Sequence, residues 1–129
     1  MLSKEYCFKI SSYIQAKEIL DICYKKKIEP IFFINHNLAV GLGSSWLKEL
    51  INMLNNEFGN KNFKIYVDTK KNYGLFLDLI DKKIDYLGVK ANKILIKKLS
   101  ELAKLNRVLI NPDFSIVDIS KIKNIISKL

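Results

Sequence analysis

The sequence has one histidine, two cysteines and one arginine, and none of its uninterrupted apolar runs exceeds four residues. A membrane-spanning helix needs about 20 apolar residues, so we expect no membrane association of that kind. With His36 alone and no Cys or acidic residue at ligand spacing, we expect no metal site. Cys7 and Cys23 lack the CxxC spacing of a redox pair, so we expect reduced, buried thiols in a cytoplasmic protein. The sequence carries no complete cofactor motif, and we expect no cofactor.

Lysine supplies almost all of the positive charge. The 22 basic residues exceed the 13 acidic ones and give a net charge of +9, yet only Arg107 is arginine. Base-specific contacts and planar phosphate recognition favour arginine over lysine. The lysines are also dispersed in small groups near the predicted helices, where they complement helix dipoles and aid solubility. We therefore expect solvated helix faces, and no nucleic-acid partner.

Short apolar runs alternate with amphipathic stretches along the chain. The runs predict buried strands at 7–10, 31–34, 63–67, 84–89 and 107–110. The amphipathic stretches predict helices from Ser12, from Ser44 or Ser45 to Gly59, over 73–82, from Asn92 and from about Ser120. Residues 35–43 are predicted to be a loop.

This alternation is that of five βα units. It predicts a single α/β domain over residues 1–129 with an open parallel sheet and helices on both faces, a flavodoxin-like three-layer sandwich. A partial barrel has the same order of elements, so the sequence leaves that alternative open.

Ligands of open parallel sheets bind beyond the carboxyl ends of the strands. Asn35, His36 and Asn37 follow the second predicted strand, and Asp68 ends the third. His36 and Asp68 are the candidates for acid–base catalysis, because imidazole and carboxylate can exchange protons. The alternatives are a surface histidine and an aspartate that begins a turn.

The run from Gly41 to Ser45 leads into a predicted helix start. Backbone N–H groups at a helix N-terminus attract anions, and small residues let a phosphate approach. A flexible loop that ends in a serine cap explains the same residues. Lys90 and Asn111 follow the fourth and fifth predicted strands. The candidate ligand-binding residues are therefore Gly41, Gly43, Ser44, Ser45, Lys90 and Asn111.

An aspartate at the end of the third strand in a chain of this length resembles a response-regulator receiver domain. That resemblance implies phosphoryl acceptance at Asp68. The family's acidic pair after the first strand is replaced here by Ser11 and Ser12, so no Mg²⁺ site is implied.

The segment from Gly43 to Trp46, with Asp68 and Gly74, is similar to a family of short, uncharacterised bacterial α/β proteins. Members of that family pair a Gly-x-x-Trp helix start with a strand that ends in Asp. The resemblance covers most of the chain and implies the α/β fold, but it brings no activity.

Two hypotheses on function follow. The first is a non-catalytic α/β module that binds a protein partner or a second copy of itself. The second is a site, catalytic or not, for a small phosphate-bearing ligand at the carboxyl ends of the strands.

Overall fold

The computed structural model describes residues 6–59 and 62–117. Within them, the strands are β1 (Tyr6–Lys9), β2 (Pro30–Ile34), β3 (Lys64–Asp68), β4 (Tyr86–Gly88), β5 (Leu109–Ile110) and β6 (Ile116–Val117). The helices are α1 (Tyr13–Lys25), α2 (His36–Phe58), α3 (Tyr73–Leu79) and α4 (Lys93–Leu105). Five strands and four helices match predicted elements, and β6 is additional. The helix expected from about Ser120 lies outside the described residues.

All strand pairs in the described sheet are parallel, in the order β5-β4-β3-β2-β1-β6. The edge strands β5 and β6 do not pair with each other, so the sheet is not closed. The predicted open parallel α/β sheet is thereby confirmed. One of its two central strands is β2, whose five residues are all buried.

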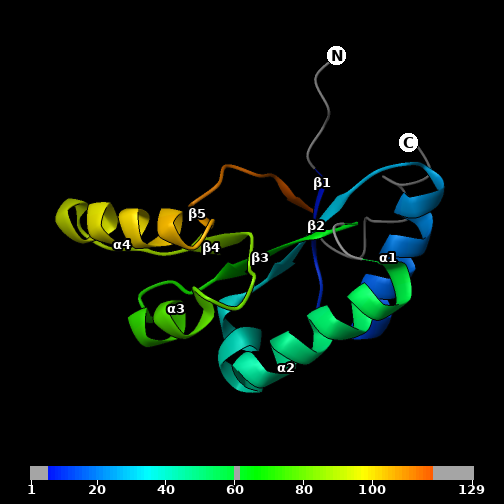
Figure 1. Ribbon diagram of the computed structural model, residues 1–129, viewed down its shortest axis with the longest axis horizontal. Coiled ribbons are helices and arrows are strands. Elements are labelled where there is room, and N and C mark those ends of the chain that lie inside the picture. Colours follow the sequence, from blue (N-terminus) through cyan, green and yellow to red (C-terminus); the bar gives the residue numbers. More distant parts are fainter. Residues whose placement is uncertain (1–5, 60–61, 118–129) are drawn as a thin grey trace, which may run out of the picture.

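The helices α1 to α4 share one hydrophobic core with alternate strand residues such as Phe8, Phe32, Ile65 and Leu87. From β1 to β5, each strand is added on the same side of the preceding one. Right-handed crossovers then place every connecting helix on the same face of the sheet. In Figure 1 the four helices surround the sheet on one side, opposite the orange segment. The described helices therefore form one layer, which differs from the expected arrangement with helices on both faces.

The second face of the sheet is crossed by residues 111–115, which join the two edge strands. Phe114 packs edge-on against Tyr86 and Tyr66, at ring-centroid distances of 5.0 and 6.3 Å. The six chain steps from Ile110 to Ile116 span at most about 22 Å. Five strand spacings in a flat sheet require about 24 Å, so the sheet must curve around this segment. The sheet is therefore curved, and it stays open.

Each described helix begins at a polar N-cap whose side-chain oxygen accepts a backbone N–H three residues on. These caps are Ser12, Asn35, Asn72 and Asn92. The cap at Asn35 changes one prediction, because it starts α2 at His36. The loop predicted over residues 35–43 is wrong: residues 36–42 are helical, and only Gly43 interrupts the helix, at φ 82° and ψ 171°.

Asp85, half-buried just before β4, ties that strand to β3. Its carboxylate accepts the Ile65 N–H at 2.9 Å. Burial raises the pKa of the Asp85 carboxyl above its ordinary value, although the Ile65 bond and the Lys64 charge act in the opposite direction. A folded chain with this raised pKa binds the proton more tightly than the unfolded chain does. The resulting stabilisation is present below the ordinary carboxyl pKa of about 4 and is lost as pH rises through the folded pKa.

We expect Asp85→Asn to keep the acceptor for Ile65 N–H and to remove the cost of burying a charge. Urea unfolding at about pH 4 and pH 7 should show the variant gaining stability relative to the parent chain as pH rises. Asp85→Ala should be less stable at both pH values, by about 1–3 kcal/mol, because the Ile65 N–H loses its partner. An Asn-minus-Asp difference that does not change with pH would contradict this prediction.

Candidate functional site at the carboxyl ends of β1 and β2

A cavity of about 520 Å³ opens where β1 and β2 end and where α1 and α2 begin. We call it the carboxyl-edge cavity. Its lining residues are Lys9, Ile10, Ser11, Gln15, Asn35, Asn37 and Leu38. The volume is within the range of small-molecule sites, and the position is the one at which parallel α/β sheets bind ligands. Lys9 is the one charged residue in this described lining.

Two lining amides already use their oxygen atoms inside the fold. Gln15 Oε1 accepts the backbone N–H and the hydroxyl of Ser11, at 2.7 and 2.9 Å. Asn35 Oδ1 accepts the Leu38 N–H at 2.9 Å. The side-chain groups of Gln15 and Asn35 that are left to bind a ligand are therefore the amide nitrogens, which are donors.

Two helix N-termini also meet at this cavity. Ser12 and Asn35 each cap one N–H of the first turn, of α1 and of α2 respectively. A helix has more unpaired N–H groups at its start than one cap can satisfy, and its dipole makes that end positive. Together with Lys9, the two helix ends give the cavity a positive potential.

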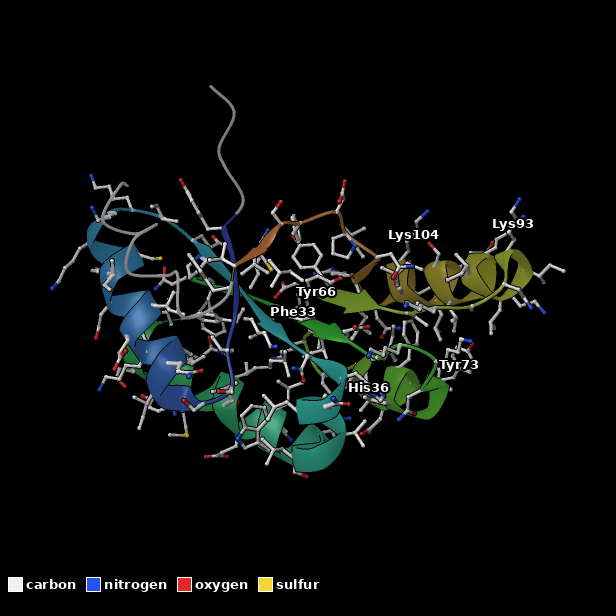
Figure 2. All side chains as sticks on the ribbon, turned by 180° about the vertical axis from the view of Figure 1, so that it is seen from behind. Phe33, His36, Tyr66, Tyr73, Lys93 and Lys104 are labelled. Carbon is white, nitrogen blue, oxygen red and sulfur yellow. The ribbon has the colours of Figure 1, made fainter. Side chains whose placement is uncertain are left out.

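The two candidate catalytic residues lie at the carboxyl ends of the neighbouring strands β2 and β3. His36 is the first residue of α2, directly after the carboxyl end of β2, as Figure 2 shows. Asp68 ends β3, and its carboxylate accepts the Lys70 N–H at 3.0 Å, which is the bond expected of an aspartate that begins a turn. Neither residue lines the carboxyl-edge cavity. Their role in catalysis stays a prediction.

Gly88 gives the Asp68 carboxylate its space. The two residues are register partners across β3 and β4, and a Cβ at position 88 would stand 3.1 Å from Asp68 Oδ1. Tyr66 precedes Asp68 by two residues and lies on the same face of β3. Burial, and then the Asp68 charge, raise the pKa of the Tyr66 phenol.

Two of the candidate ligand residues hold the strand ends together through contacts of their own. Asn111 adopts a left-handed conformation, with φ of 51°, and its Oδ1 accepts the Val89 N–H at 2.8 Å. The backbone of Lys90 donates to Lys70 O at 2.9 Å and accepts from the Tyr73 hydroxyl at 2.8 Å. The Asn111 oxygen is thus engaged in joining β4 to β5, whereas the exposed Lys90 amine extends from a fixed backbone.

The stretch from Gly41 to Ser45 lies inside α2 rather than in a loop. Because Gly43 leaves helical geometry, the helix starts again at Ser44. A Cβ added at Gly41 or Gly43 would meet nothing within 4 Å. An anion cradle at Gly41, Gly43, Ser44 and Ser45 therefore stays a prediction, and these residues do not line the carboxyl-edge cavity.

Sequence reasoning placed Asn35 and Asn37 at this edge but missed Lys9, Ser11 and Gln15. The rule that selected residues after strands two to five applies equally to the first strand, whose end at Lys9 and Ser11 would have been found that way. Sequence reasoning also placed Thr69, next to Asp68, at this edge. Thr69 is buried, and its hydroxyl donates to Gly88 O at 2.6 Å, which fixes the turn after β3.

The two cysteines are free and buried on opposite sides of the sheet, Cys7 on the second face and Cys23 in the core beneath α1. Burial raises the pKa of Cys7 to about 12 and that of Cys23 to about 11. Thiols that stay protonated are poor nucleophiles and poor metal ligands. Residues 6–59 and 62–117 contain no cluster of three His, Cys, Asp or Glu residues suited to a metal ion.

The chain matches no protein-family model, and no curated protein is significantly similar to it in sequence. Within the described part of the chain, none of the helices has the length and apolar character needed to cross a membrane.

Proposed function

We propose that this protein is a non-catalytic binding domain whose ligand is a small anionic molecule, held in the carboxyl-edge cavity. The observation that carries the proposal is the donor character of the lining. The Lys9 amine, the amide nitrogens of Gln15 and Asn35, and two helix N-termini all favour an acceptor with negative charge.

The lining also suggests what the rest of the ligand is. The half-buried Leu38 supplies apolar surface beside the polar groups. A carboxylate or phosphate attached to a small organic body would use both kinds of surface. Phosphate is the group that the sequence favours, because helix N-termini bind it through backbone N–H groups.

A second cavity, of about 580 Å³, has a different character. It lies at the opposite edge of the sheet, and its lining includes Glu29 together with Lys25 and Lys27. The Glu29 carboxylate would repel an anion bound there. The amino ends of parallel strands are also not where ligands of this fold class bind.

The test is the unfolding temperature of the full chain with inorganic phosphate, sugar phosphates, nucleotides and small carboxylates. A ligand at about 100 times its dissociation constant should stabilise the folded state by about 2.7 kcal/mol. Lys9→Glu should weaken binding of the best ligand by about tenfold or more, because it puts a negative charge in the lining.

Matched variants distinguish binding in this cavity from a general effect of net charge and from binding at Gly43. Lys25→Glu makes the same change in net charge at the other end of α1 and should leave the affinity within about twofold. Ser44→Ala/Ser45→Ala and Lys90→Ala test the anion cradle and the lysine predicted from sequence. If no compound binds, or if Lys9→Glu binds as tightly as the parent chain, the proposal fails. If only the Ser44→Ala/Ser45→Ala variant loses binding, the site lies at Gly43 instead.

A further inference from the structure

The helix α4 presents a basic and apolar outer face at the end of the molecule away from α1. Its inner side packs into the core through Leu99 and Ala103, which are buried. It lies along β5, an edge strand of the sheet. Figure 1 shows α4 at one end of the molecule, with α1 at the opposite end. The outer face is therefore separate from the carboxyl-edge cavity.

Four exposed lysines lie on this outer face, namely Lys93, Lys97, Lys98 and Lys104. Glu101 is the one acidic residue of α4. Lys93, Lys97 and Lys104 follow at i, i+4 and i+11, which places them along one line of the helix. Figure 2 shows Lys93 and Lys104 extending from the two ends of α4 in the same direction. Ion pairs between described residues involve Lys17, Lys64 and Lys82, on other elements.

Two large apolar side chains lie beside the lysines. Ile94 is 73% exposed, and Leu105, at 83%, is more exposed than any other large apolar residue in the described chain. They are also eleven positions apart, so they share one line of the helix, with Lys98 between them. Single exposed apolar residues are ordinary. Here two of them are aligned within a set of positive charges, which is the composition of an apolar contact with a charged rim.

We propose that the outer face of α4, formed by these four lysines with Ile94 and Leu105, docks an acidic, partly apolar surface of a partner protein. Charge complementarity requires a partner surface with negative charge, because α4 carries four lysines and one glutamate. Ile94 and Leu105 select its second property, because burying them requires an apolar contact. This docking surface goes beyond the proposed ligand site and does not depend on it.

The same observations disfavour the other occupants. Nucleic acid recognition would use arginine, and phosphates gain nothing from Ile94 or Leu105. A helix lying in a membrane surface buries its whole apolar face in lipid, but the apolar face of α4 is already packed in the core. A symmetric dimer through this face would oppose lysine to lysine.

The test is binding of the full chain to an acidic peptide in which Glu and Asp alternate with Leu and Phe. Duplex DNA and vesicles containing phosphatidylserine serve as the competing probes. We expect binding to the peptide, with amide shift changes confined to residues 93–107. Lys93→Glu/Lys97→Glu/Lys104→Glu and Ile94→Ser/Leu105→Ser should each weaken it by about tenfold or more.

Two control variants match these changes elsewhere on the surface. Lys25→Glu/Lys26→Glu/Lys48→Glu makes the same change in net charge, and Ile14→Ser/Tyr24→Ser removes similarly exposed apolar side chains of α1. Both should stay within about twofold of the parent chain. The proposal is overturned if the controls lose as much affinity as the α4 variants, if DNA or vesicles bind α4 more tightly than the peptide, or if the peptide does not bind.

Discussion

Gly43→Ala should lower the free energy of unfolding by about 1–3 kcal/mol. With φ of 82° and ψ of 171°, Gly43 occupies a backbone region that is accessible essentially to glycine alone. A Cβ at this position would meet no other atom within 4 Å. The expected loss is therefore conformational, and it needs no steric clash with a neighbouring element.

Gly41 provides the matched control two residues earlier. It lies in the helical turns before the interruption and has no positive φ, and a Cβ there would also meet open space. Gly41→Ala should therefore stabilise the chain by about 0.5–1 kcal/mol, since alanine favours the helix. Denaturant unfolding of the two variants measures both effects. Equal changes of the same sign would show that α2 is not interrupted at Gly43.

Phe32→Ala should lower the free energy of unfolding by about 3–5 kcal/mol. Phe32 is in β2, its side chain is 0% exposed, and its ring lies 5.8 Å from that of Phe63 in the core beneath the helices. Removal of the ring leaves a cavity at the centre of the sheet, which strands on both sides of β2 hold in place.

Phe33→Ala should report on the other face. Phe33 is 8% exposed, and its ring lies 4.9 Å from that of Tyr66, in the cluster that Phe114 joins. We expect Phe33→Ala to reduce the hydrogen-exchange protection of the backbone amides of residues 111–117. Phe32→Ala should cause no such local loss of protection there. The control Leu105→Ala, at a highly exposed position, should change stability by no more than about 0.5 kcal/mol. If Phe32→Ala costs as little as this control, the assignment of the core is wrong.

Several elements could be predicted from local sequence because local chemistry determines them. The oxygen of Ser12 caps α1 wherever that helix packs, and Gly59 supplies the positive φ that ends α2. The run from Ile31 to Ile34 predicts a buried strand because a strand covered on both faces is apolar at consecutive positions. The elements β5 and α4 were also predicted, because their local sequence determines them.

The loop predicted over residues 35–43 failed through competing local signals. The glycines and serines of residues 41–45 suggest a break followed by a new helix cap. Asn35, eight residues before Gly43, instead caps a helix that begins there. The break occurs, but it is one residue long. The sequence shows that a glycine such as Gly43 can adopt a positive φ. It does not show at which residue the helix is interrupted.

The sequence by itself determined the alternation of strands and helices, and with it an open parallel α/β sheet whose carboxyl ends gather polar residues. Only the tertiary structure decided which strands are neighbours, because pairing depends on contacts between residues far apart in the chain. The order from β1 to β5 puts the four helices on one face, and the return to β6 draws Phe114 across the other. The same order brings Lys9 beside Asn35, and so places the cavity between the starts of α1 and α2 rather than at Gly43.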